Sequence, residues 1–187
     1  MDKRDRICDK ALELFLRDGY EQTPLSRVAK ALGLSKAGLY HYFSSKEELL
    51  FQIHERQMER TFIPVLEKAE KIADPTERVA FFMREYILHA MTQDPSVRVV
   101  VHETQNLART HRARIDRVWR RGFDLIRNAL LEMKAAGKAK DVNMTFATFG
   151  ALGMCSWIFY WFDYSRQESA RELADTYVEI FLRGLSK

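Results

Sequence analysis

Residues 23–48 constrain the fold more than any other stretch, because they encode two short helices, a glycine turn and the start of a third helix. Thr23 is a good N-cap and Pro24 fits the first helical position, so we expect a helix to begin here. The apolar residues that follow have the i, i+3, i+4, i+7 spacing of one buried helix face: Leu25, Val28, Ala29 and Leu32. Gly33 can adopt a positive φ and end this helix, and Ser35 can cap a new one after a short turn. The stretch therefore predicts a helix-turn-helix unit.

The second short helix is expected to have an outward face rich in small and hydrogen-bonding residues. Leu39 and Phe43 lie one turn apart and should pack inward. That leaves the following residues on or near the opposite face: Lys36, Ala37, Gly38, Tyr40 and His41. A helix that enters a DNA major groove needs small residues where its backbone approaches, with hydrogen-bonding tips around them. The pattern favours a DNA-reading helix over a plain helical hairpin, which the spacing alone would also permit.

The third helix of this stretch should open with a capping box formed by Ser45 and Glu48. Lys46 then lies in the first turn, where a cation opposes the helix dipole. We therefore expect a phosphate contact, and not a local structural benefit, to be the reason for Lys46.

These residues, together with the glycine and tyrosine before them, resemble the N-terminal signature of the TetR family of transcriptional repressors. The matching residues are Gly19, Tyr20, Thr23, Val28, Ala29, Gly33, Leu34, Ser35, Lys36, Leu39, Tyr40, His41, Tyr42, Phe43, Lys46, Glu47, Glu48 and Leu49. Two positions depart from the commonest pattern, which often has Thr or Ser at Pro24 and Thr at Gly38. The resemblance implies a homodimeric repressor that binds a palindromic double-stranded DNA operator and is released by a small-molecule effector. The DNA-contacting residues it implies are Thr23, Ser35, Lys36, Ala37, Gly38, Tyr40, His41, Tyr42 and Lys46.

Basic charge is concentrated in two parts of the chain. The net charge of +4 is too modest to identify a nucleic-acid partner by itself. Residues 1–46 contain nine Lys and Arg against six Asp and Glu, whereas residues 107–140 contain ten against three. Only the first concentration coincides with the expected DNA-reading helices. The second consists largely of Arg109, Arg112, Arg114, Arg117, Arg120, Arg121 and Arg127.

A solvated helix face explains any one of these arginines, but six between positions 109 and 121 form a field suited to a polyanionic ligand. Nearer the C-terminus a second string resembles the subgroup of TetR regulators that sense acyl-CoA thioesters. It comprises Gly153, Met154, Cys155, Ser156, Trp157, Trp161 and Phe162, with Glu172, Leu173, Ala174, Asp175, Phe181, Leu182, Arg183, Gly184 and Leu185 downstream. The string departs from the pattern of this subgroup at two positions: members often have Arg where this chain has Tyr160 and Tyr where it has Phe162.

We therefore predict that the effector is an acyl-CoA or a related apolar anion, with its chain in the helical core and its phosphates toward the arginines. The ligand-binding residues on this hypothesis are Phe82, Tyr86, Arg109, Arg112, Arg117, Arg121 and Trp157. One alternative is a TetR-type regulator of multidrug efflux that senses neutral or cationic apolar compounds. An alternative of another class is a helical small-ligand carrier without operator binding.

The whole chain should be all-α, with about nine helices and no strand. The expected segments are 4–17, 23–32, 35–43, a long helix from 45 that Pro64 kinks or divides, a helix from Asp74-Pro75, a shorter one from Asp94-Pro95 to about 107, then 110–136, 143–164 and 169–183. Gly137 and Gly184 should end two of them. We expect residues 1–46 to be the helix-turn-helix DNA-binding domain and residues 47–187 the ligand-binding and dimerisation domain.

The last two helices are apolar on more than one face, so they must be covered on more than one face. Small residues such as Ala147, Gly150 and Gly153 permit close helix approach, which favours a four-helix bundle with a second copy over a fully buried helix in a monomer. The family resemblance also implies a dimer built from these helices. The predicted interface residues are Phe149, Gly153, Trp161, Tyr177 and Phe181.

Several kinds of chemistry are not indicated. Cys8 and Cys155 lie far apart with no metal-ligand spacing, so we expect no metal, no cofactor and no disulfide framework. The chain has no Gly-rich phosphate loop, G-x-S-x-G or HExxH motif, and we predict that it is not an enzyme. It has no secretory segment and no apolar run long enough to span a bilayer, so a cytoplasmic protein without membrane contact is expected.

Overall fold

The computed structural model describes residues 2–90, 99, 102–161 and 169–186; the side chains at 90 and 159–161 are not among those described. This part of the chain is helical with connecting turns, and its sole pairing of strand type is an isolated bridge between Ala139 and Ser186. The prediction of an all-α fold is confirmed. None of the described helices is long and apolar enough to cross a membrane.

The chain divides into two compact units. The first, called the head unit below, contains Met1–Glu59 and Asp94–Asp116, and the second, called the core unit, contains Arg60–Gln93 and Arg117–Lys187. The long helix α8 (Arg109–Ala135) contributes its first two turns to the head unit and the rest to the core unit.

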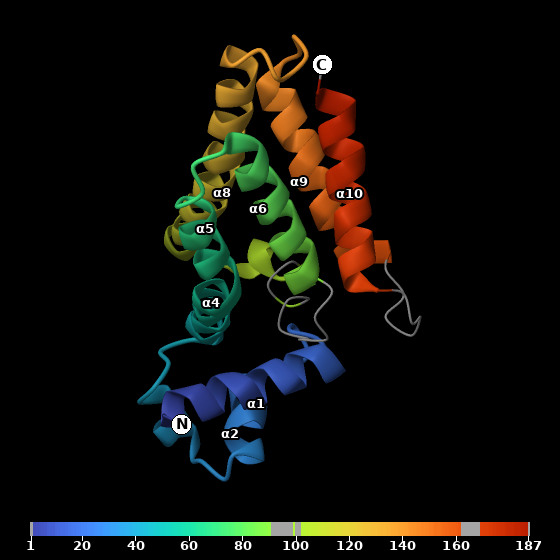
Figure 1. The fold of residues 1–187 in the computed structure, drawn as a ribbon. Helices are drawn as coiled ribbons and strands as arrows, with labels where there is room; N and C mark the ends of the chain where they lie inside the picture. Colours follow the sequence, from blue (N-terminus) through green and yellow to red (C-terminus); the bar gives the residue numbers. More distant parts are fainter. Residues whose placement is uncertain (1, 91–98, 100–101, 162–168, 187) are drawn as a thin grey trace. The chain divides into compact units, whose positions relative to one another are not determined.

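The head unit contains α1 (Lys3–Asp18), α2 (Leu25–Ala31), α3 (Lys36–Tyr40) and α4 (Lys46–Gln57) (Figure 1). α1 packs on α2 and α4, and α2 packs on α3. The residues that fill the space between them are almost fully buried: Ile7, Cys8, Ala11, Leu14, Phe15, Val28, Leu39, Phe43 and Leu49. Most of these are the apolar positions that the helical spacing predicts, which is why the buried faces of these helices were predictable.

Ion pairs and hydrogen bonds fix α4 within the head unit. The Arg56 guanidinium contacts the carboxylates of Asp5 at 3.3 Å and Asp9 at 3.2 Å, which joins the end of α4 to α1. At its other end, the Glu47 carboxylate accepts hydrogen bonds from the Ala108 N–H at 2.7 Å and from His111 Nδ1 at 2.9 Å. The start of α8 is thereby held against the first turn of α4.

Two local predictions in the head unit were wrong in detail. Pro24, with extended backbone, is the N-cap of α2, and the Thr23 hydroxyl instead donates to the Gly19 carbonyl at 2.9 Å. Thr23 therefore closes the turn after α1 and does not cap α2. Ser45 accepts from the Glu48 N–H at 2.9 Å as predicted, but the Glu48 carboxylate accepts from the Ser44 N–H at 2.6 Å and not from Ser45.

The helix that continues from α4 changes geometry before Pro64. Met58–Phe62 forms a π-helical turn, η1, and α5 (Ile63–Ala69) follows with Pro64 in its first turn. Proline lacks an N–H and its ring collides with the carbonyl four residues earlier, so the wider π turn accommodates it. The prediction that Pro64 divides the helix is confirmed, although the form of the division was not foreseen.

Helix α6 (Pro75–Ala90) occupies the middle of the core unit, packed on α5, α9 (Met144–Trp161) and α10 (Ala170–Leu185) (Figure 1). Asp74 caps it, since its carboxylate accepts from the N–H groups of Thr76 at 2.8 Å and Glu77 at 3.0 Å. Its inward residues are fully buried or nearly so: Val79, Phe82, Met83 and Ile87.

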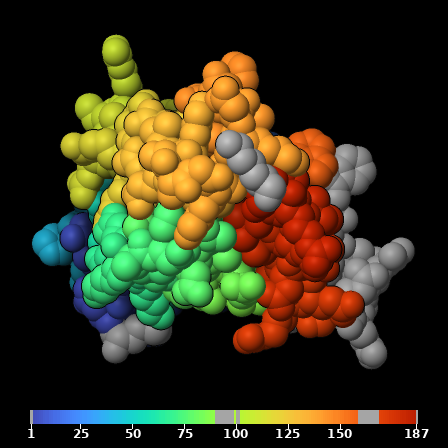
Figure 2. Space-filling model, turned by 45° about the horizontal axis from the view of Figure 1, so that its top comes forward, coloured from blue at the N-terminus to red at the C-terminus, as the bar shows by residue number. Residues whose placement is uncertain are grey.

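One of the two predicted helix-ending glycines has that role. Gly137 has a φ of 70° and ends α8 as expected, whereas α10 runs through Gly184, which has no positive φ. The prediction for Gly184 was wrong because a tertiary contact ends the helix instead: the Lys140 N–H donates to the Leu185 carbonyl at 2.8 Å. Figure 2 shows the segment after α8, in orange, against α10, in red.

The helix predicted from Asp94-Pro95 starts outside the described residues, of which Val99 and His102 are helical and a short 3-10 helix, η2 (Thr104–Asn106), follows. The last residues of the helix predicted over 143–164 also lie outside the described part.

Candidate DNA-binding and effector sites

Helix α3 is held from its inner side and leaves its outer side open. Ser35 accepts a hydrogen bond from the Gly38 N–H at 3.0 Å, as predicted for a cap, and Leu39 is fully buried beneath the helix. Gly38 keeps this cap tight, since a Cβ there would lie 3.1 Å from the Ser35 hydroxyl. Of the predicted DNA-contacting residues in and directly after this helix, Gly38 is half-buried and four are exposed: Lys36, Ala37, Tyr40 and His41. They form one outward face.

Two cations of α1 hold the segment after α3, and sequence reasoning missed both. The Arg4 guanidinium donates to the Tyr42 carbonyl at 2.7 Å and lies over the Phe43 ring. Lys3 Nζ lies 5.5 Å from the centre of the half-buried Tyr42 ring. Their signal was in the sequence, because cations in a first helical turn oppose the helix dipole and so suggest another partner.

Lys46 has a structural contact that the sequence analysis excluded. Its Nζ lies 4.0 Å from the centre of the Tyr20 ring and donates to the Glu21 carbonyl at 3.2 Å. Burial lowers the pKa of the Lys46 ammonium and raises that of the Tyr20 hydroxyl to about 12. The argument that Lys46 has no structural benefit was therefore wrong. The Thr23 side chain is fully buried, which leaves it no surface to offer a phosphate.

An aromatic cluster lies inside the core unit, and it differs from the predicted set. Phe82 and Tyr86 belong to it as expected, and the Tyr86 hydroxyl lies 3.1 Å from Ser156 Oγ. Phe62 and Trp119 complete the cluster and were missed. Trp119 has a sequence signal, since it continues the apolar stripe of α8 one turn after Ile115.

Trp157 does not lie in this cluster, so its placement in the buried core was wrong. Its side chain is 61% exposed. In α9 it follows Gly150 and Gly153 on one face, and the residues that pack inward on α6 are Ala151, Cys155 and Ile158. An aromatic-rich helix gives no unique inward face, which is why the sequence misassigned it.

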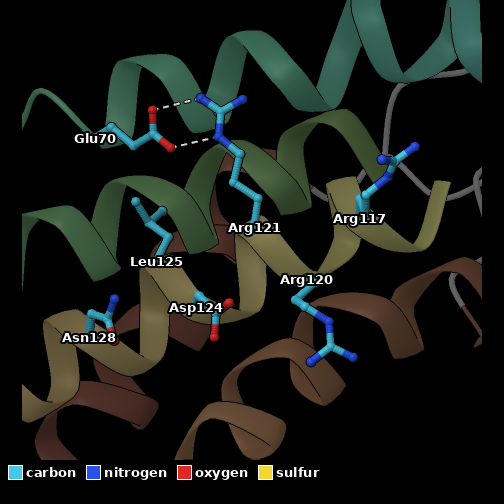
Figure 3. A pocket seen from close by; sticks show the side chains of 7 residues that line it. All are labelled: Glu70, Arg117, Arg120, Arg121, Asp124, Leu125 and Asn128. Carbon is cyan, nitrogen blue, oxygen red and sulfur yellow. Dashed lines mark hydrogen bonds and ion pairs between the residues drawn. The ribbon is translucent and has the colours of Figure 1, made fainter. Parts of the chain in front are cut away.

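The arginines of α8 fall into two groups. Arg109 and Arg112 are exposed in its first turns, within the head unit. In the core unit a surface hollow of about 510 Å³ has three arginines in its lining, which comprises Glu70, Arg117, Arg120, Arg121, Asp124, Leu125 and Asn128 (Figure 3).

One arginine of the hollow is neutralised by a carboxylate. Arg121 makes a bidentate pair with Glu70, with Nε to Oε1 at 2.7 Å and a terminal nitrogen to Oε2 at 2.6 Å. The hydrogen bond from Arg121 lowers the pKa of the Glu70 carboxyl. Figure 3 shows Arg120 pointing away from Glu70, and neither Arg117 nor Arg120 forms an ion pair among the described residues. The hollow therefore offers two guanidinium groups to an anion.

The predicted dimer residues lie on exposed or half-exposed surface of α9 and α10. Phe149 is 61% exposed, Gly153 is exposed, and Tyr177 and Phe181 are half-buried. The Trp161 side chain lies outside the described residues. Phe146, Trp157 and Ile180 add 71%, 61% and 57% exposed side chains. Large apolar groups this exposed are typical of an interaction surface.

No group of three or more His, Cys, Asp or Glu side chains in the described part of the chain could hold a metal ion. Cys8 and Cys155 are both buried and unpaired with each other, and burial raises the pKa of the Cys155 thiol to about 12. The Cys155 thiol is packed as a small apolar group, whereas the Cys8 thiol also contacts the Arg56 guanidinium.

Comparison with known proteins agrees with this geometry. A family model described as bacterial regulatory proteins, tetR family, matches residues 7–53, and one described as tetracyclin repressor-like, C-terminal domain, matches residues 73–185. The solved structure of PfmR, a TetR family transcriptional regulator from Thermus thermophilus, is 32% identical with a TM-score of 0.85, over 98% of this chain and 100% of that chain.

Two further relatives carry functional descriptions. AibR, solved in complex with isovaleryl coenzyme A and operator DNA, is 32% identical with a TM-score of 0.86, over 96% of this chain and 97% of that chain. The fatty acid metabolism regulator protein of Bacillus subtilis (strain 168) is 23% identical over 137 residues, which are 73% of this chain and 70% of the relative. The chain therefore belongs to the tetR family of bacterial regulatory proteins, as its N-terminal signature predicts, and is a transcriptional regulator and not an enzyme.

Proposed function

We propose that this chain is a homodimeric repressor in which residues 1–46 bind a palindromic operator and residues 47–187 bind the effector and the second copy. The exposed face of α3 supports the first part, because its small residues and polar tips suit a major groove. A two-fold dimer presents two equivalent α3 helices, so the half-sites should face one side of the duplex. The AibR structure with operator DNA supports the same assignment.

Most of the direct DNA contacts in this proposal come from Lys36, Tyr40 and His41, with Ala37 and Gly38 where the backbone approaches the DNA. Tyr42 and Lys46 lie at the edge of this surface and contact phosphates, and Ser35 keeps α3 capped. Thr23 supports the turn from within.

The proposed effector is an acyl-CoA or a related apolar anion. One observation supports this most: α8 presents Trp119 to the aromatic cluster while Arg117, Arg120 and Arg121 line the hollow within the same unit. An apolar chain and a polyanionic head need these two surfaces together, and a neutral drug needs only the first. The relatives described with isovaleryl coenzyme A and with fatty acid metabolism support this class.

A second candidate is a neutral or cationic apolar effector of the kind an efflux regulator senses. The Glu70 carboxylate favours it, since it already neutralises Arg121 and would repel an incoming phosphate. A carrier without an operator is the weakest alternative, because the chain belongs to a family of regulators.

The protein has one conformation that fits the operator and one that does not. Release from DNA requires that the effector bind the second conformation more tightly than the first. To move the population from 1:99 to 99:1, that preference must be about 5.5 kcal/mol.

The decisive experiment is a gel shift with the region upstream of the chain's own gene, titrated with an acyl-CoA series, the matching free acids and neutral drugs. We expect a sequence-specific shift at moderate salt that thioesters reverse and free acids do not. Arg117→Ala should weaken the thioester effect, and Glu70→Gln should strengthen it by up to about 1 kcal/mol, because the surface ion pair it removes competes for Arg121. Absence of the shift contradicts the repressor proposal, and release by free acids or drugs alone contradicts the acyl-CoA proposal.

A further inference from the structure

Phe62 occupies the centre of the aromatic cluster in the core unit. Its ring is buried, and its centre lies 4.6 Å from that of Trp119, 5.6 Å from that of Tyr86 and 5.8 Å from that of Phe82. The Tyr86 ring in turn carries the hydroxyl that contacts Ser156 Oγ. The Phe62 ring thus fills a site that is surrounded by aromatic rings and has the Tyr86 and Ser156 hydroxyls near it.

The Phe62 ring fits only because residue 122 of α8 has no side chain. A Cβ on Gly122 would lie 3.3 Å from Phe62 Cε1 and 2.9 Å from Cζ, and the second distance is closer than real Cβ atoms approach a neighbour. Glycine inside a long helix lowers its stability relative to alanine. Gly122 therefore weakens α8 locally and creates a seat of the size of one phenyl ring.

The backbone that carries Phe62 departs from ordinary α geometry. Phe62 is the last residue of the π turn η1, directly before α5 and its Pro64. Single π turns are rare within α-helices and occur frequently at functional sites. Because the π turn accommodates Pro64, a change of the Phe62 side-chain rotamer, and not a return of these five residues to α geometry, is the movement available to the ring.

We propose that Phe62 and Gly122 determine which effectors bind, because the apolar group of the effector takes the seat of the Phe62 ring. The inference rests on the proposed function for the class of effector. An acyl group about the size of the ring fits the space beside Gly122, and its carbonyl oxygen accepts a hydrogen bond from the Tyr86 and Ser156 hydroxyl pair. The displaced ring moves aside by a change of its side-chain rotamer.

The test compares ligand affinities of the full-length protein by calorimetry, with butyryl-CoA, octanoyl-CoA, free CoA and the uncharged ethyl butyrate as probes. The variants are Phe62→Ala and the milder Phe62→Leu, which keeps more of the packing if the alanine variant folds poorly. Leu130→Ala is the matched control, since it opens a space at another fully buried position of α8.

We expect Phe62→Ala to bind butyryl-CoA about tenfold more tightly than the wild type, the factor for a seat that is open in roughly one molecule in ten. Phe62→Leu should lie between the two, free CoA should be unaffected, and Leu130→Ala should bind butyryl-CoA as the wild type does. If the role of Phe62 were purely structural, its replacement would not increase the affinity for butyryl-CoA.

A second measurement follows the ring itself. With 4-fluorophenylalanine at position 62, the fluorine signal should become accessible to a soluble paramagnetic quencher when butyryl-CoA is added to otherwise unmodified protein. A fluorine that stays protected at saturating ligand overturns the proposal.

The outcomes separate this inference from the proposed effector class. If butyryl-CoA binds the wild type and Phe62→Ala equally well, the seat proposal is overturned and the acyl-CoA proposal stands. If no thioester binds either protein but ethyl butyrate binds Phe62→Ala more tightly than both wild type and Leu130→Ala, the seat stands and the acyl-CoA proposal falls. If no probe binds Phe62→Ala more tightly than the wild type, the seat proposal is overturned.

Discussion

Lys46 is the residue at which the head unit's own packing and its proposed DNA contact meet. Its ammonium lies over the Tyr20 ring, and the residue itself belongs to the first turn of α4. A cation over an aromatic ring contributes roughly 0.5–1 kcal/mol at an exposed site and more when desolvated. Removing the side chain should therefore have two separable effects.

Lys46→Ala should lower the free energy of unfolding by about 1 kcal/mol, because the contact with Tyr20 is lost. It should also weaken binding to all DNA sequences alike and reduce the salt slope by about one. Lys36→Ala is the control, since its exposed side chain should change unfolding by less than about 0.5 kcal/mol while weakening DNA binding. Thermal unfolding and salt-dependent binding measure the two effects. A changed base preference in Lys46→Ala would show that Lys46 does not contact a phosphate.

Glu48 should make the head unit sensitive to acid. Hydrogen bonds from Ser44 lower the pKa of the Glu48 carboxyl below its ordinary value of 4.5. A group whose pKa is lower in the folded state stabilises the fold above its unfolded pKa and loses that contribution as the pH falls through its folded pKa. Glu48→Gln should thus be less stable than the wild type above about pH 5.5, and the difference should shrink below pH 4.5. Denaturant unfolding from pH 3 to 7 tests this, and Ser44→Ala should show the same narrowing.

Residue roles were predictable where they depend on spacing within a single helix. Ser35 caps α3 and Leu39 is buried because both follow from spacing within one helix. Thr23 and Trp157 were misassigned because their surroundings are set by other elements: Thr23 bonds to the end of α1, and Trp157 is turned away from α6. Helical spacing alone carries no information of that kind.

At the scale of elements, two glycines near the end of the core unit give a direct comparison. Gly137 has a positive φ, whereas Gly184 lies inside α10 with open space around it. Gly137→Ala should destabilise the protein by about 1 kcal/mol, since alanine is strained at positive φ. Gly184→Ala should stabilise it by up to about 1 kcal/mol through helix propensity. Denaturant unfolding measures both. If Gly184→Ala destabilises, the helix does end at that glycine.

Element boundaries were predictable where a cap or a proline marks them, as at Asp74-Pro75 and at Gly137. The π turn before Pro64 was not, because proline requires only that the α pattern be interrupted. Whether the chain kinks, breaks or widens there depends on the packing of Phe62 against α8, which becomes visible only in the folded unit.

At the scale of the molecule, the exposed apolar face of α9 determines the proposed assembly. Phe149→Asp should abolish the dimer, because it places an unpaired charge in the proposed helix bundle. Leu131→Asp is the control, since Leu131 is an exposed apolar residue of α8, 46% accessible, that the proposed interface does not include. Sedimentation should give monomers for the first variant and dimers for the second. If both variants sediment as dimers, the interface does not include Phe149 and lies elsewhere.

The positions of the tryptophans have a spectroscopic consequence. Trp119 lies beside Phe62 within the core unit, whereas Trp157 is largely exposed on the α9 face. Emission from Trp119 should therefore respond to displacement of the Phe62 ring, and emission from Trp157 should shift to shorter wavelength when a second copy excludes water from it. Replacing one tryptophan at a time by phenylalanine, with Trp161 replaced in both variants, yields two optical reporters without any added dye. The variant that keeps Trp119 then reports effector occupancy, and the variant that keeps Trp157 reports subunit association.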